Sequence, residues 1–336
     1  MDDLSLAGKH MFGPPVIVTS GLTKNFGRLV AVDHVSLSIR ESEVFGLLGP
    51  NGAGKTTMLS MLATLLKPTE GTATVNTHDI VRESDAVRRS IGIVFQEPSS
   101  DDILTGRENL YLHALMYGVE SSLRAQRIRD VLRLVDLEDR ANSQVKTYSG
   151  GMRRRLELAR GLLHKPKILF LDEPTLGLDP QTREHIWQYI RSLADQERVT
   201  VILTTHYMDE AEHLCDRVAI IDDGKIVTLD TPDRLKQIIG GDIVRLRIKK
   251  PNLSPIKDLG YVLKIEQTGG TVLLTVKNSS AHLQEILNLV GNVESVELRT
   301  PTLNDVFLHY TGHEIRDAEA EGGFFERAVR ARSGGQ

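Results

Sequence analysis

Residues 49–57, GPNGAGKTT, have the G-x-x-x-x-G-K-[ST] spacing of a loop that binds nucleotide phosphates. The glycines let successive backbone N–H groups turn toward a polyphosphate, and the helix expected to begin near Lys55 adds the positive end of its dipole. Lys55 places a charge at the β- and γ-phosphate oxygens, and Thr56 offers a hydroxyl to Mg²⁺. A Gly-rich segment before a helix can be only a tight turn, but the flanking strand and helix favour the phosphate site. We therefore expect ATP or GTP to bind at Gly49, Pro50, Asn51, Gly52, Ala53, Gly54, Lys55, Thr56 and Thr57.

Two adjacent carboxylates, Asp172 and Glu173, end the apolar segment KILFLDEP. The carboxyl edge of a parallel sheet is where open α/β folds bind ligands. Adjacent residues there can serve different partners, so we expect Asp172 to order the Mg²⁺ shell and Glu173 to polarise an attacking water. A solvated acidic turn before Pro174 is a reasonable interpretation of the dipeptide alone, but the phosphate loop favours the catalytic one.

Two further apolar strands also end in polar residues. VTVILTTH ends in His206, a neutral donor near pH 7 for a γ-phosphate, and GIVFQ ends in Gln96, whose amide can contact both metal and water. A lone histidine at a strand end is usually structural. Here it is one of several polar residues expected at the same sheet edge, which favours a catalytic role.

The stretch YSGGMRRRLELARG, residues 148–161, combines glycines with three arginines. At about 100° per residue, Arg153, Arg154 and Arg155 point in different directions around a helix, so they form no single basic face for nucleic acid. We expect these arginines at the surface and at a subunit contact. The hydroxyl and exposed N–H groups at the start of this helix, from Ser149, Gly150 and Gly151, predict an anion site.

The elements that must position these residues predict an α/β fold. Strands of near-continuous Ile, Leu and Val alternate with helices, which indicates a parallel sheet covered on both faces. Residues 16–48 read instead as antiparallel strands, EVFGLL included. After Gly240 and Gly241, the order β-α-β-β-α-β plus a helix predicts a small α+β domain of ferredoxin-like type, with LSPIKDL as its first helix.

The predicted domains are an N-terminal extension (1–15), a nucleotide-binding domain (16–239) with a helical subdomain (97–160), a C-terminal α+β domain (240–313) and a flexible tail (314–336). A length of 336 residues with 40% hydrophobic residues fits about two domains.

The formal net charge of -4 gives no global positive excess for nucleic acid or anionic lipid. The only cysteine, Cys215, excludes an internal disulfide. We find no signal peptide and no apolar run of about 20 residues, and we expect a soluble cytoplasmic chain.

Six motifs occur in one order: GPNGAGKTT, FQEP, YSGGM, ILFLDEP, GLDP and TTH. With them, residues 16–239 resemble the ATP-binding subunit of ABC transporters, a P-loop NTPase whose nucleotide lies between two protomers. The resemblance implies a Walker A loop at residues 49–57, Gln96 in the Q-loop, a signature at Ser149–Met152, Asp172 as the Walker B aspartate, Glu173 as general base, Asp179 in the D-loop and His206 as the switch histidine. Phe26 stands where a tyrosine usually stacks on adenine; the ring remains, so stacking should survive. The signature reads YSGGM where LSGGQ is commonest.

The segments DDILTGRENLYLHALMYGV and TPTLNDVFLHYTG resemble the daunorubicin-resistance type of ABC ATPase. That resemblance implies an ATP-hydrolysing homodimer, with Mg²⁺, that drives a separate multi-span permease of the ABC-2 type. Such systems most often export drugs, lipids or polysaccharides. The chain would then lie on the inner face of the cell membrane through the permease.

Three alternatives stand beside the exporter. The first is a non-transport ABC ATPase, but a chromosome-type one needs long coiled-coil insertions and a translation-type one carries two cassettes; this chain has neither. A metabolic P-loop kinase would not explain the Ser-Gly-Gly signature or Asp179. An importer ATPase also can carry a ferredoxin-like C-terminal domain, and only the resemblance of LNDVFL favours the exporter group over it.

Overall fold

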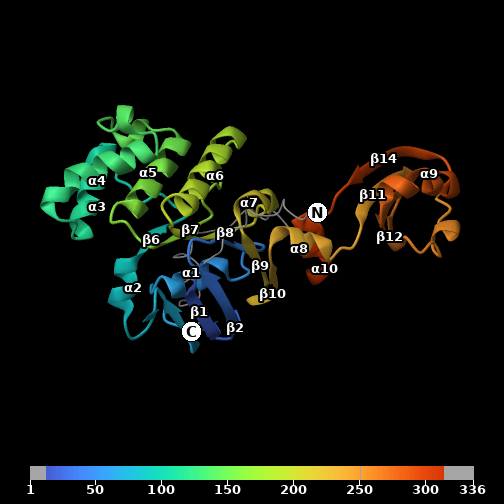
Figure 1. Ribbon diagram of the computed structural model, residues 1–336, viewed down its shortest axis with the longest axis horizontal. Helices are drawn as coiled ribbons and strands as arrows, with labels where there is room; N and C mark the ends of the chain where they lie inside the picture. The colour runs from blue at the N-terminus through green and yellow to red at the C-terminus, as the bar shows by residue number, and fades with distance from the viewer. Residues whose placement is uncertain (1–12, 250, 314–336) are drawn as a thin grey trace, which may run out of the picture. The chain divides into compact units, whose positions relative to one another are not determined.

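The computed structural model describes residues 13–249 and 251–313, and its elements are labelled in Figure 1. These residues divide into two compact units, and the chain passes from the first to the second between Thr228 and Leu229, earlier than the boundary expected at residues 239–240. The short helix α8 (Pro232–Gln237) belongs to the second unit because it packs on α10 (Leu303–Thr311). The predicted tail, residues 314–336, and residues 1–12 of the predicted extension lie outside the described residues.

The first unit contains a six-stranded sheet with the order β10-β9-β3-β8-β7-β6. Its strands are β3 (Val44–Leu48), β6 (Ile91–Val94), β7 (Ile168–Asp172), β8 (Thr200–Thr205), β9 (Arg217–Asp222) and β10 (Lys225–Asp230). β3, β7 and β8 are buried along their whole length, as strands covered on both faces must be. From β9 to β6 the neighbours pair in parallel, so their carboxyl ends meet at one edge. The predicted α/β class is confirmed.

Four of the helices that connect strands of the first unit are α1 (Lys55–Leu62), α2 (Ser84–Ser90), α6 (Pro180–Asp195) and α7 (Met208–Leu214). The helix α6 begins where the side chain of Asp179 accepts a hydrogen bond from Thr182 N and Pro180 occupies the first helical position. Both residues favour a helix start, because the cap satisfies an unpaired N–H and proline has none to lose.

A second sheet of the first unit has the order β2-β1-β4-β5, with antiparallel pairs throughout. Its strands are β1 (Pro15–Phe26), β2 (Leu29–Arg40), β4 (Glu70–Val75) and β5 (His78–Asp79). The antiparallel assignment of residues 16–48 was wrong for its last strand. β3 lies between β9 and β8 in the parallel sheet, because its five buried residues leave no solvent-facing side.

The remaining helices of the first unit are α3 (Gly106–Met116), α4 (Ser121–Leu134) and α5 (Gly150–Leu162), with 3-10 turns at Glu138–Arg140 and Val145–Thr147. Figure 1 shows α3, α4 and α5 gathered beside β6. Thr105 and Glu108 form a capping box at the start of α3, and Ser149 caps α5. The signature residues therefore lie at a helix N-terminus, as the sequence predicts.

The second unit has a four-stranded antiparallel sheet of order β12-β13-β11-β14. Its strands are β11 (Asp242–Ile248), β12 (Val262–Thr268), β13 (Thr271–Val276) and β14 (Val293–Arg299), and α9 (Ser279–Val290) packs on one face through Ile286 and Val290. The predicted helix LSPIKDL is only a 3-10 turn, Ser254–Ile256, because Pro255 removes a backbone donor and Gly260 follows closely.

Candidate active site

Five of the predicted residues meet at the carboxyl edge of the parallel sheet: Lys55, Thr56, Asp172, Glu173 and His206. Three segments supply them. Lys55 and Thr56 open α1 after the loop that follows β3, Asp172 and Glu173 end β7, and His206 follows β8. The strand register pairs Leu48 with Thr205 and Asp172 with Thr204, which brings the three segments to the same level.

The loop before α1 turns through two glycines with left-handed backbones, Gly52 (φ 88°) and Gly54 (φ 101°). A Cβ on Gly54 would lie 2.2 Å from Ala31 O, so no other residue fits there without displacing backbone. Gly54 is also the N-cap of α1 and supplies no side-chain cap. The first turn of α1 therefore presents its backbone N–H groups toward the loop, as an anion site requires.

The ammonium group of Lys55 is 4% exposed and lies across this loop. Its Nζ donates to Gly49 O at 2.8 Å and Pro50 O at 3.0 Å, and it lies 3.6 Å from Glu173 Oε1. The lysine thus contacts both the phosphate-type loop and the candidate base.

The carboxylate of Asp172 is 3% exposed and accepts two hydroxyl hydrogen bonds at the same oxygen. Thr204 Oγ1 donates to Asp172 Oδ1 at 2.6 Å, and Thr56 Oγ1 donates to it at 3.1 Å. Burial raises the pKa of Asp172 above its usual value, although both hydrogen bonds act to lower it. Sequence reasoning missed Thr204. The sequence did contain a signal, because two threonines, Thr204 and Thr205, end the largely apolar strand β8.

The Glu173 backbone adopts a left-handed conformation (φ 47°), which is strained for a residue with a Cβ. Its N–H donates to Thr204 Oγ1 at 3.0 Å, and its carboxylate lies between Lys55 and His206, whose Nδ1 is 3.2 Å from Oε1. Burial acts to raise the pKa of Glu173, but His206 and the charge of Lys55 outweigh it, and the net shift is downward. Glu173 is therefore ionised at neutral pH, as a base must be.

Three predicted residues lie apart from this cluster. Gln96 is exposed just beyond β6, Ser149 Oγ accepts from Met152 N at 3.2 Å, and Asp179 accepts from Thr182 N at 3.0 Å. Within the described part of the chain, none of the three hydrogen-bonds to the cluster. Gly150 has open space around it, whereas a Cβ on Gly151 would lie 2.6 Å from Thr182 Cγ2.

Phe26 ends β1 and is partly buried. Lys24 Nζ lies 5.2 Å from the centroid of its ring. An aromatic face at this position can stack on a base, and a neighbouring cation adds favourable electrostatics to such a ring.

The expectation that all three arginines of the signature helix lie at the surface was wrong for Arg154. Its guanidinium is buried and, within residues 13–249 and 251–313, hydrogen-bonds only to backbone carbonyls. The neighbouring Arg155 donates to the carbonyls of Val135 and Asp136, at the end of α4. Arg154 shares a helix face with Leu158, which is also buried, and this face turns toward the sheet.

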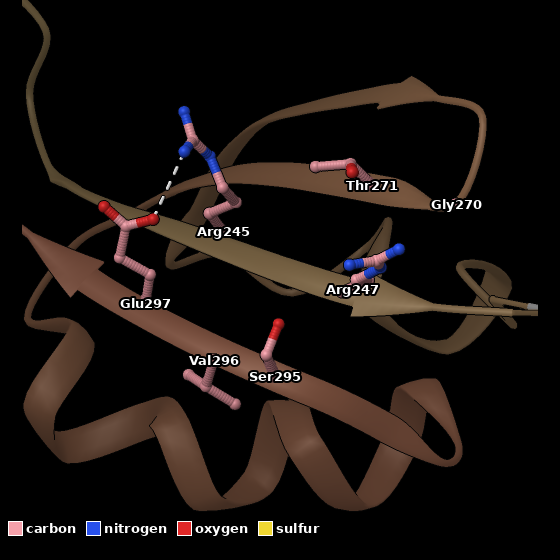
Figure 2. A pocket seen from close by; sticks show the side chains of 7 residues that line it. All are labelled: Arg245, Arg247, Gly270, Thr271, Ser295, Val296 and Glu297. Atoms are coloured by element: carbon pink, nitrogen blue, oxygen red, sulfur yellow. Dashed lines mark hydrogen bonds and ion pairs between the residues drawn. The ribbon is translucent and has the colours of Figure 1, made fainter.

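A surface pocket of about 550 Å³ lies elsewhere, on the second unit. Figure 2 shows its lining from β11, β13 and β14, where Arg245 pairs with Glu297 at 3.2 Å beside Arg247, Thr271 and Ser295. It contains none of the predicted site residues.

None of the described helices is long and apolar enough to cross a membrane.

The sequence matches the ABC transporter family over residues 32–176 and the ATP-binding protein DrrA1-3-like C-terminal domain over residues 231–311. A daunorubicin resistance ATP-binding protein of Streptomyces coeruleorubidus is 40% identical over 316 residues, covering 90% of this chain and 98% of that protein. A Nod factor export ATP-binding protein of Cupriavidus metallidurans is 38% identical over 305 residues, covering 90% of this chain and 99% of that protein.

Among solved structures, a dimeric ATP-binding cassette in a post-hydrolysis state with ADP and Pi has a TM-score of 0.58 and 31% identity. It is matched over 64% of this chain and 98% of that chain. The family resemblance and the ATPase activity expected from the motifs are confirmed. The chain belongs to the family of ABC transporter ATP-binding proteins, with an ATPase domain followed by a DrrA1-3-like C-terminal domain.

Proposed function

We propose that this ATPase works as a homodimer on a separate multi-span permease of the ABC-2 type, and that it drives export of a drug, lipid or polysaccharide. The observation that carries the catalytic part is the position of Glu173, ionised and held between Lys55 and His206 at the edge where the phosphate loop lies. The names of the two relatives, in drug resistance and in export, support the transport part.

In this proposal Glu173 accepts a proton from the attacking water. His206 contacts the γ-phosphate, and Lys55 shifts from the loop carbonyls to the β- and γ-phosphate oxygens. A carboxylate with a lowered pKa is a weak base in water. The positive charge of Lys55 keeps it ionised, and the buried position strengthens its interaction with the water it orients.

The residues present fit a magnesium ion. Thr56 and Asp172 offer hard oxygen ligands already 3.1 Å apart, and Mg²⁺ commonly takes one or two carboxylates together with substrate phosphates. Gln96 would join them if the segment after β6 moved inward. When bound, the ion neutralises charge that develops on the phosphates.

We propose that the second half of each ATP site comes from another copy of the chain. Ser149, Gly150 and Asp179 are exposed, and among the described residues none of them hydrogen-bonds to the cluster of the same chain. Ser149 caps the N-terminus of α5, so this helix end can approach the γ-phosphate that a partner's loop holds. The dimeric state of the similar solved cassette supports this arrangement.

The experiment that tests the transport role is co-purification of the chain from its native membranes, followed by identification of the bound proteins. We expect a multi-span membrane protein in near-equal amount, and an ATP hydrolysis rate that changes when it is present. Recovery without any membrane protein, with a hydrolysis rate indifferent to added membranes, would contradict the transport role and leave the ATPase assignment intact.

A further inference from the structure

Arg154 is the fifth residue of the signature helix α5, and its guanidinium binds three backbone carbonyls from two strand ends. Nε donates to Pro174 O at 2.6 Å, Nη1 to Phe95 O at 2.5 Å, and Nη2 to Asp172 O at 3.0 Å. The fixed planar fork of arginine makes such a three-way contact possible, whereas a lysine ammonium is a compact point charge.

The group is 6% exposed and carries no ion pair to a carboxylate among the residues described. Burial lowers its pKa to about 10, so Arg154 is still a cation at neutral pH. The nearby carboxylates of Glu157, Asp172, Glu210 and Glu173 favour the charged form, but burial outweighs them, and a buried cation without a direct ion pair is costly to keep. A residue that only filled space at this position would be served better by an apolar side chain.

Two of the three acceptors flank Glu173. Asp172 O precedes it and Pro174 O follows it, so Arg154 holds the backbone on both sides of the strained residue. A left-handed backbone at a residue with a Cβ persists only where its surroundings hold it. Together with the bond from Glu173 N to Thr204 Oγ1, Arg154 holds the backbone from which the Glu173 side chain projects.

The third acceptor, Phe95 O, belongs to the residue immediately before Gln96. The arginine itself lies five residues after Ser149, on the helix that Ser149 caps. One side chain therefore joins the helix of the signature, the segment of Gln96 and the backbone around Glu173.

We propose that Arg154 is a positioning residue that couples the signature helix to the catalytic carboxylate. When Ser149 engages a phosphate, movement of α5 is transmitted through the guanidinium to the backbone at Glu173 and Gln96. The inference rests on the proposed role of Glu173 and adds a link between that residue and the signature.

The test uses the purified full chain with Arg154→Gln, Arg154→Lys and Arg155→Gln, each alone and combined with Glu173→Gln. Arg155 is the matched control because it lies on the same helix and also donates to backbone carbonyls, those of Val135 and Asp136. Steady-state hydrolysis gives kcat and KM for ATP, and single-turnover hydrolysis of radiolabelled ATP gives the residual rate in the Glu173→Gln background.

We expect Arg154→Gln to lower kcat by about 10- to 100-fold while KM for ATP changes by less than about threefold. Arg154→Lys should fall between this variant and the wild type, which gives a readout if Arg154→Gln does not fold. Arg155→Gln should keep kcat within about twofold. In the Glu173→Gln background, Arg154→Gln should lower the residual rate by no more than about twofold, because the two residues act through one step.

An equal fold loss in both backgrounds would contradict the coupling to Glu173, and so would a raised KM with unchanged kcat. If Arg154→Gln keeps the wild-type kcat while Glu173→Gln is inactive, the positioning role of Arg154 is wrong and the role of Glu173 stands. Near-normal kcat for Glu173→Gln itself would instead overturn the proposed role of Glu173.

Discussion

His206 Nδ1 lies 3.2 Å from Glu173 Oε1, and each side chain is only 10% exposed. The two residues follow neighbouring parallel strands, β8 and β7, whose register fixes this approach. The imidazole is therefore placed to influence the protonation state of the candidate base, and we propose that it also contacts a phosphate. This double position makes His206 a testable determinant of the pH dependence of hydrolysis.

His206→Ala should move the acid limb of kcat to higher pH. Burial acts to raise the pKa of Glu173, and the contact with His206 is the largest influence that lowers it. Without His206 the pKa of Glu173 rises, so the base becomes protonated, and hydrolysis is lost, at a higher pH than in the wild type. The pH profile of kcat measures this shift, and an unmoved acid limb would contradict the assignment.

Asp172→Asn should stabilise the fold while it removes Mg²⁺-dependent hydrolysis. Burial raises the pKa of Asp172, so the folded chain holds this proton more tightly than the unfolded chain does. The destabilisation by the ionised group is present in full above the folded pKa and disappears as pH falls below the unfolded one. We expect a melting temperature about 2–4 °C higher at neutral pH.

The difference in melting temperature between Asp172→Asn and the wild type should shrink as the pH is lowered. Thermal denaturation across an acidic pH series measures it. A lower melting temperature for the variant at neutral pH, or a gap that widens on acidification, is incompatible with a buried ionised Asp172.

Phe26→Ala should weaken nucleotide binding more than it slows turnover. Stacking of an aromatic side chain on a base contributes about 1–3 kcal/mol, so Kd for ATP should rise by about 5- to 150-fold. Phe26→Tyr keeps the ring and should stay within about threefold of the wild type. Titration with a fluorescent ATP analogue gives both constants, and equal affinities for all three proteins would remove Phe26 from the site.

Ser149→Asp and Ser149→Asn form a matched pair for the composite site. Both side chains are as good as serine at a helix N-cap, so both variants should melt within about 3 °C of the wild type. Only the aspartate places a negative charge where a partner's γ-phosphate is proposed to lie. We expect hydrolysis by Ser149→Asp to fall at least about tenfold below that of Ser149→Asn. Equal rates would argue against a phosphate at this serine.

The sequence alone was sufficient to predict where the glycine loop and the strand-end carboxylates lie, because each motif is contiguous and its neighbours set its conformation. Lys55, Asp172 and His206 occupy the predicted sheet edge for this reason. Contacts between segments were harder to anticipate. The hydroxyl of Thr204 reaches Asp172 through the strand register, and a threonine in an apolar run also reads as an ordinary strand residue.

Arg154 shows the same limit at a helix. Three consecutive arginines indicate an exposed segment by composition, but only the rotation of α5 decides which of them faces the sheet. The spacing from Arg154 to the buried Leu158 and Leu162 carried that information. Gln96 is a different case. Its expected contact with metal and water is not formed in the single chain, because the segment that carries it is exposed.

The central claim, that Glu173 is the base of an ATP site completed by a second chain, is tested most directly by ATP turnover of Glu173→Gln. Glutamine keeps the shape of the side chain and cannot accept the proton. The variant should still bind ATP, should accumulate as a dimer with trapped nucleotide, and should hydrolyse ATP at least about 100-fold more slowly than the wild type. Steady-state hydrolysis near the wild-type rate would contradict the account.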